Sequence, residues 1–294
     1  MAIDKFIKEY ESLHQVTLVV DRRIEETEPP RSGELEDSIA RTFLLKFSFL
    51  RNNQNCYFSV VIQIPYFRPN YTMEQKLLLH KKEIYMYEKV LPTMYESWTQ
   101  EKLSPNYYAH ESQSGILILE NLYQEGLFKM SETSFSFPEC KVVLKCLAQF
   151  HALSTVHLDK VLSVLDSLTV TDRAPIIGEA ETNIVFEKFR KFSFPLIINE
   201  EMKKAIDKIF TNYRFLMNLA FLPNLNRLNV IIHGNVRWSN LYFQNDDEDN
   251  AVVKFKFVDF RNSRRGSPAI DLVHFLTTSA QFEVFIKHRN FLFE

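Results

Sequence analysis

The stretch that decides the fold runs from Val230 to Phe260 and reads VIIHGNVRWSNLYFQNDDEDNAVVKFKFVDF. It opens on an apolar segment, passes through a polar loop and a short second segment, and crosses an acidic turn at 245–250. In the last segment Lys254 and Lys256 alternate with apolar residues, which is the period of a half-buried strand. The pattern predicts three strands, the last of which ends on an acid, Asp259.

Two polar residues lie at the ends of these predicted segments. Asn240 closes the polar loop, and Asp259 follows the last strand. Loops at strand ends commonly carry function because the strands hold them rigidly. An amide oxygen and a carboxylate are suitable ligands for Mg²⁺ beside phosphate groups. The sequence therefore predicts a metal-binding pair of Asn240 and Asp259.

This layout resembles the ecdysteroid kinase-like (CHK kinase-like) family, relatives of choline and aminoglycoside kinases. That family carries His-Gly-Asp, four residues, then Asn, and later Val-Asp-Phe, whereas the loop here begins His233-Gly234-Asn235. The resemblance implies that Asn240 and Asp259 hold the metal and that His233 orients the loop. It also implies that Asn235 stands where the family has its catalytic Asp.

Further segments resemble the same family in the same order along the chain. They are the strands at 42–65, the helix segment 83–92, the segment 119–122, the helix segment 147–152 and the segment 266–272, which reads GSPAIDL. The resemblance implies a two-lobed, kinase-like α/β (α+β) fold. Its N-lobe, built on an antiparallel sheet, would span residues 1–119, and its mainly helical C-lobe would span 120–294.

The N-terminal part is predicted to be a helix followed by strands. Residues 1–13 place apolar residues at helical spacing, and 16–20 is typical of a strand. The acidic, proline-containing segment 24–32 is expected to be a solvated connector. Strands at 42–49 and 56–65, joined by a polar turn, would complete an antiparallel meander.

The resemblance also implies positions for a nucleotide's phosphates. The family has a lysine just before a proline on the last strand of the meander, and here Gln63 stands in its place. An amide donates hydrogen bonds but lacks the charge that steadies a polyphosphate. Lys46 on the preceding strand either reaches in instead or is a surface lysine. The loop at Gly33 either covers the phosphates or is a plain inter-strand loop.

A long helix is predicted from Met73 to Trp98, interrupted by Pro92. Glu83 on this helix stands where the family has the partner of the strand lysine. Without that lysine, we expect Glu83 to be a solvated helix residue. After the next buried strand, main-chain groups at Glu120 and Leu122 would pair with an adenine, because a strand edge needs only its backbone to do so.

The later helices carry fewer signals of chemistry. His151 lies on the apolar face of a helix predicted at 138–154, so we expect it to be packed, hydrogen-bonded and structural. Another helix is predicted at 202–219. An aromatic cluster is expected either in the core or on the wall of an apolar pocket, and its members are Phe186, Phe189, Phe192 and Phe194.

Composition excludes several classes of function. A net charge of −2 gives no reason to expect nucleic acid as a partner. Three cysteines without paired spacing indicate a reducing compartment, and no apolar run approaches the ~20 residues of a membrane helix. We expect a cytoplasmic protein. The resembled family continues for roughly a hundred more residues, so we expect a truncated C-lobe, exposed apolar surface beside 271–278, and self-association.

Two functional interpretations remain open. The first is a small-molecule kinase that uses ATP and Mg²⁺ to phosphorylate a hydroxyl of a steroid or xenobiotic acceptor, as the resemblance implies. The second is a pseudokinase that keeps the fold for binding. Loss of a general base typically costs ~10²–10⁴-fold in rate. Because Asn235 and Gln63 replace two functional residues and part of the acceptor site is expected to be absent, we favour impaired catalysis.

Overall fold

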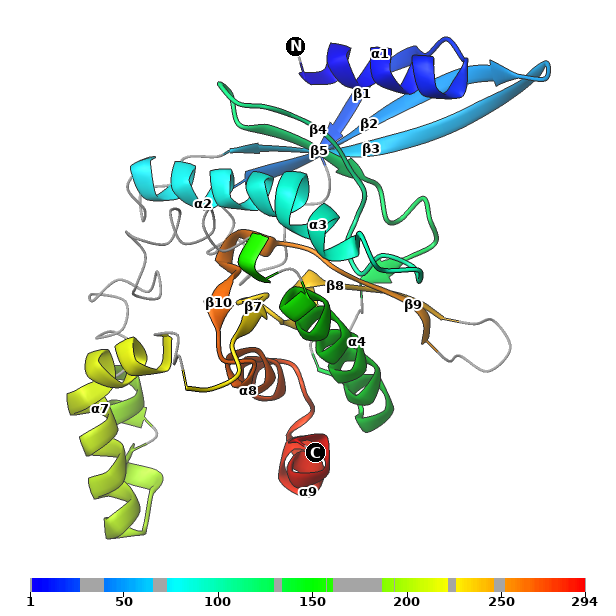
Figure 1. The fold of residues 1–294 in the computed structure, drawn as a ribbon. Helices are drawn as coiled ribbons and strands as arrows, with labels where there is room; N and C mark the ends of the chain where they lie inside the picture. Colours follow the sequence, from blue (N-terminus) through cyan, green and yellow to red (C-terminus); the bar gives the residue numbers. More distant parts are fainter. Residues whose placement is uncertain are drawn as a thin grey trace.

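The computed structural model describes residues 2–26, 40–65, 73–129, 134–156, 158–160, 187–192, 194–221, 226–245 and 252–293. Figure 1 shows a sheet covered on its outer side by helix α1, with helices α2 and α3 on its other side, above the remaining strands and helices. The Gly33 loop and the acidic residues 246–250 lie outside the described residues.

Five antiparallel strands form the N-terminal sheet in the order β1-β2-β3-β5-β4. They are β1 (Val19–Glu26), β2 (Ala40–Arg51), β3 (Gln54–Pro65), β4 (Tyr107–Glu111) and β5 (Ile116–Glu120). Helix α1 (Ala2–His14) packs on one face, where the ring of Phe6 contacts that of Phe47 at 5.6 Å between centroids. The predicted helix and meander are confirmed.

The first strand corrects the prediction for the N-terminal region. A strand was expected at 16–20 and a solvated connector from residue 24, but β1 runs from Val19 to Glu26. Its acidic end pairs with β2, with Glu25 opposite Leu44 and a bulge between Asp21 and Ile24. Backbone pairing with a long neighbouring strand therefore outweighs the polar composition of this segment, which alone favours a loop.

The helix predicted from 73 to 98 is continuous through Pro92. It consists of α2 (Met73–Tyr85), a π-helical turn (Met86–Val90) and α3 (Leu91–Tyr95). Pro92 falls in the first turn of α3, where a missing N–H removes no bond of that helix. The π turn absorbs the change of hydrogen bonding, so the predicted interruption does not occur.

The C-terminal part combines helices with two small sheets. The helices are α4 (Phe137–Val156), α7 (Glu200–Phe221), α8 (Ala269–Thr278) and α9 (Phe282–Phe293), with short turns η2 (Phe194–Leu196), η3 (Trp238–Asn240) and η4 (Phe260–Asn262). The strands pair as β6-β8-β9 and β10-β7, with bounds β6 (Phe128–Lys129), β7 (Val230–Ile232), β8 (Leu241–Asn245), β9 (Val252–Phe257) and β10 (Arg264–Gly266).

These elements enclose an aromatic core, to which the 230–260 stretch contributes two rings and α4 a third. The rings of Phe150 on α4, Phe257 on β9 and Phe260 on η4 are buried, and the ring of Phe150 lies 5.8 Å from each of the other two between centroids. The predicted aromatic cluster is not a single core: Phe189 packs edge-on against Phe210 of α7, while Phe192 is 64% exposed, and Phe186 lies outside the described residues.

Apolar side chains are exposed on the last two helices, beside residues 271–278 as expected. Val273 on α8 and Phe282, Ile286 and Phe291 on α9 are each at least half exposed. Within the described part of the chain, no helix has both the length and the apolar character needed to cross a bilayer.

Candidate active site

A buried carboxylate holds the turn that follows β7. The two oxygens of Asp271 on α8 accept the backbone N–H groups of His233 (2.7 Å) and Gly234 (2.8 Å). Gly234 adopts φ 79°, and a Cβ there would run into the carbonyl oxygen of Asn262. The turn therefore requires glycine at this position.

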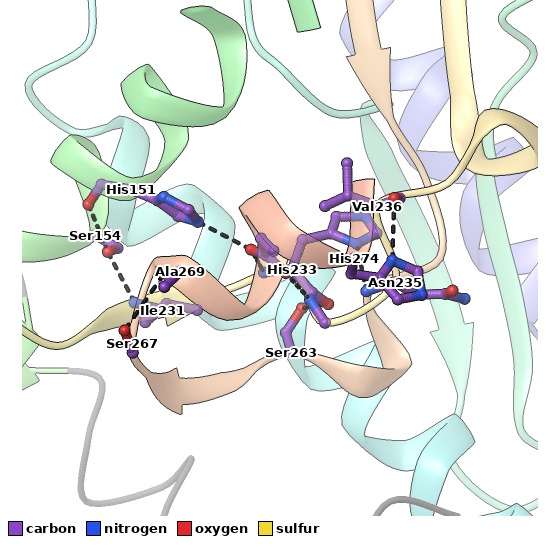
Figure 2. A network of polar contacts seen from close by, with 12 residues as sticks. His151, Ser154, Ile231, His233, Asn235, Val236, Ser263, Ser267, Ala269 and His274 are labelled. Carbon is purple, nitrogen blue, oxygen red and sulfur yellow. Dashed lines mark hydrogen bonds and ion pairs between the residues drawn. The ribbon is translucent and has the colours of Figure 1, made fainter. Parts of the chain in front are cut away.

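The same carboxylate ties α4 to the turn, and Figure 2 shows His151 and Ser154 of α4 beside Ile231 and His233. His151 Nε2 lies 2.9 Å from Asp271 Oδ2, and Ser154 Oγ accepts the N–H of Ile231 at 2.9 Å. His151 is buried and hydrogen-bonded, as predicted. Burial alone would raise the pKa of Asp271, but hydrogen bonds and charge from His151, together with His233 and the Gly234 N–H, lower it overall.

His233 connects the turn to the end of β9. Its Nδ1 accepts the N–H of Asn235 at 3.2 Å, so its Nε2 carries the proton and donates to the carbonyl of Val258 at 3.0 Å. Burial is the main reason that the pKa of His233 is lowered, which keeps the ring neutral. His233 thus fixes the distance between the loop and the segment that carries Asp259.

Three of the predicted site residues meet at one point. Asn235 Nδ2 donates to Asp259 Oδ2 at 2.8 Å, and Asn240 Nδ2 lies 3.3 Å from the same oxygen. Asn240 Nδ2 also donates to the backbone carbonyl of Asn235 at 3.0 Å. Asp259 itself is left-handed, with φ 70° and ψ 66°. A non-glycine residue in this region is strained, and such strain is concentrated at functional sites.

A fourth residue, Arg261, forms an ion pair with the carboxylate of Asp259, and it was not predicted from the sequence. Arg261 places Nε 2.7 Å from Oδ1 and Nη2 2.8 Å from Oδ2 of Asp259. Both side chains are 12% exposed. The only signal in the sequence is a basic residue two positions after the acid, and nothing about that spacing distinguishes a paired arginine from a solvated one.

The arrangement does not fit a bound Mg²⁺. This ion requires oxygen ligands at about 2.0–2.1 Å in octahedral geometry. Here the oxygens of Asp259 face a guanidinium, and Asn240 turns its amide nitrogen toward them. Among the described residues, no group of three or more His, Cys, Asp and Glu side chains could hold a metal either.

Glu83 is not the solvated residue that the sequence suggested. It lies on the buried side of α2, is 3% exposed, and its helix packs against η4. Burial, reinforced by the charge of Asp259 and opposed by that of Arg261, raises the pKa of Glu83 to about 8. The prediction failed because it inferred exposure from the loss of a partner, whereas exposure is set by the packing of the helix.

This burial makes stability depend on pH. Between about pH 4.5 and 8 the folded chain keeps the Glu83 proton while the unfolded chain releases it, so stability falls as the pH rises. One proton corresponds to a slope of about 1.4 kcal/mol per pH unit. We expect Glu83→Gln to remove this slope in urea unfolding at pH 5.5, 6.5 and 7.5. Glu88→Gln on the adjoining turn is the control. If the free energy of unfolding changes with pH by the same slope in wild type and Glu83→Gln, the raised pKa of Glu83 is disproved.

Gln63 lies in the middle of the sheet. On β3 it is opposite Thr42 and Leu117. Its neighbour Ile62 is buried in the core beneath α1, so the side chain of Gln63 points to the other face, where α2 lies. Its Oε1 is buried without a hydrogen-bond partner among the described residues.

The segment after β5 is tied down on two sides. Glu120 donates its N–H to Asn106 O at 2.9 Å, and Leu122 O accepts the N–H of Leu127 at 2.9 Å. A cavity of about 730 Å³ opens beside this segment. Its lining includes Lys46 and Ser48 from β2, Tyr57 and Ser59 from β3, and Asn121, Tyr123 and Gln124.

Lys256 corrects the alternation predicted for β9. The pattern predicted a half-buried strand, but Lys256 on its polar face is 5% exposed and its Nζ lies 2.9 Å from Glu120 Oε2. This ion pair joins β9 to the end of β5. Alternation identifies which residues share a face of a strand, and it does not determine whether another element covers that face.

The fold is that of a kinase-like α+β protein. It combines an antiparallel five-stranded sheet, a helix with a buried glutamate, and a block of loops and strands that carries Asn235, Asn240 and Asp259. The chain belongs to the ecdysteroid kinase-like family, whose family model matches residues 42–294. A search of curated proteins found no match. The family as a whole indicates kinase-like, small-molecule phosphotransferases.

Proposed function

We propose that this chain is a kinase-like protein whose phosphoryl transfer is impaired. The observation that carries the proposal is the contact at Asn235, whose amide nitrogen donates to Asp259 at 2.8 Å. A carboxylate in the catalytic position accepts the proton of an acceptor hydroxyl and holds that hydroxyl in line. An amide has no basic site, and here its nitrogen is committed to the neighbouring acid.

Two other residues support the proposal. Gln63 supplies no positive charge on the face of β3 that carries the phosphate-binding lysine in the family. Arg261 occupies the carboxylate that would hold the metal. Phosphoryl transfer depends on charge stabilisation and positioning of the phosphates more than on proton removal. Without the phosphate-binding lysine and without a metal ion at Asp259, phosphoryl transfer is weakened beyond the effect of Asn235 alone. A site of this class would take ATP as its nucleotide and the hydroxyl of a small molecule as its acceptor.

The test is phosphate release with MgATP. We expect wild type to remain at background and the triple variant Asn235→Asp/Gln63→Lys/Arg261→Gln to exceed it at least about tenfold. The triple variant restores a carboxylate and a phosphate-binding charge and frees Asp259 for a metal. The matched control is Gln54→Lys/Asn55→Asp, which makes the first two changes at exposed positions on β3 and should stay at background.

Wild-type turnover in the ordinary kinase range, roughly 1–100 s⁻¹, would overturn the proposal and identify the chain as an active small-molecule kinase. A folded triple variant that stays at background would show that these three residues do not cause the loss.

A further inference from the structure

Both carboxylate oxygens of Asp259 lie against nitrogen atoms of neighbouring side chains. Oδ2 faces Arg261 Nη2 at 2.8 Å, Asn235 Nδ2 at 2.8 Å and Asn240 Nδ2 at 3.3 Å, while Oδ1 faces Arg261 Nε at 2.7 Å. Oδ2 therefore accepts three hydrogen bonds, whereas Oδ1 is buried beside the guanidinium as an ion-pair contact and has no hydrogen-bond partner among the described residues.

The backbone holds Arg261 in this position. Asp259 is left-handed, and the chain then enters the short turn η4, with Phe260 buried between the two residues. The ring of Phe260 packs edge-on against that of Tyr87 at 5.4 Å between centroids and lies tilted against that of His233 at 4.8 Å. Because these ring contacts hold the turn, the guanidinium of Arg261 lies against the acid two residues before it, with one hydrogen bond to Oδ2 and an ion-pair contact to Oδ1.

We infer that Arg261 is a built-in cation at Asp259 and that it closes this position to divalent metals. A metal would have to displace the guanidinium of an arginine side chain that is 12% exposed and that lies within 2.8 Å of both carboxylate oxygens. It would also have to turn the amides of Asn235 and Asn240, which present nitrogen rather than oxygen. Mg²⁺ and Mn²⁺ bind oxygen, so neither amide helps them as it is placed here.

The inference deepens the proposed function and rests on the same contact between Arg261 and Asp259. Its test uses metal alone, without nucleotide or turnover. Failure of the metal test would leave the phosphate-release result standing, and the reverse is also true. The two proposals can therefore be distinguished.

The experiment measures Mn²⁺ uptake by the decrease of the free-ion electron paramagnetic resonance signal. We expect wild type to take up no more Mn²⁺ than Asp259→Asn does. Arg261→Gln should bind one Mn²⁺ per chain, and Asp259→Asn/Arg261→Gln should lose it. The charge control is Arg51→Gln at the exposed end of β2, which should behave as wild type. An excess of Mg²⁺ should raise the Tm of Arg261→Gln, because it binds the folded state, and should leave that of wild type unchanged.

Two results would overturn the inference. The first is Mn²⁺ uptake by wild type that disappears in Asp259→Asn, because the position would then be open despite Arg261. The second is a folded Arg261→Gln variant that takes up no Mn²⁺, because Arg261 would then not be what closes the site. If the glutamine variant does not fold, Arg261→Met, which keeps the length of the apolar stem, carries the same expectation.

Discussion

Replacing Asp271 with alanine is expected to lower the free energy of unfolding by about 3–5 kcal/mol. Its carboxylate is fully buried and holds His233 N at 2.7 Å, Gly234 N at 2.8 Å and His151 Nε2 at 2.9 Å. Alanine would leave two backbone donors and a histidine buried without their acceptor. Each unsatisfied group costs about 1–3 kcal/mol.

The measurement is urea unfolding at pH 7, with Asp207→Ala on α7 as the control, because that aspartate is exposed and forms an ion pair with the exposed Arg190. Asp271→Asn should fall between the two, since its amide keeps one acceptor oxygen. The pKa of Asp271 is lowered in the folded state, so the advantage of wild type over Asp271→Asn is present at neutral pH and decreases as the pH falls through that lowered pKa. A loss below about 1 kcal/mol for Asp271→Ala would mean that the turn does not depend on this carboxylate.

Much of the fold could be predicted because its signals are local. Helices α4 and α7 follow from the spacing of apolar residues, and β2 and β3 follow from two apolar runs around a polar turn. The stretch 230–260 was predictable for the same reason: β7, β8 and β9 lie where its apolar segments lie.

The site was predicted in part, and what was missed depends on distant partners. Asn235, Asn240 and Asp259 were expected near one another, and the structure brings them together. The burial of Glu83 depends on packing against η4, far along the chain. The pairing of Arg261 with Asp259 depends on a left-handed backbone that a single sequence does not reveal at a non-glycine residue. Such features are set by tertiary packing, which periodicity does not report.

Lys256 shows this dependence most directly and leads to the second large effect. We expect Lys256→Met to lower the free energy of unfolding by about 3–5 kcal/mol. The lysine and Glu120 are only 6% and 10% exposed in their side chains, and their charged atoms lie 2.9 Å apart. Glu120 Oε2 also accepts the N–H of Asn106 at 3.0 Å. Methionine keeps the apolar stem but leaves the carboxylate of Glu120 buried without a cation.

Lys254→Met is the matched control, because this lysine lies two residues away on the same face of β9 and is only partly buried. The double variant Lys256→Met/Glu120→Gln should recover most of the loss, since it removes the unpaired charge while the glutamine oxygen still accepts from Asn106. Urea unfolding of wild type, Lys256→Met, Glu120→Gln and the double variant forms a double-mutant cycle. Equal losses for Lys256→Met and Lys254→Met would show that the ion pair adds nothing. A coupling of several kcal/mol would instead identify it as the contact that holds β9 to the end of β5.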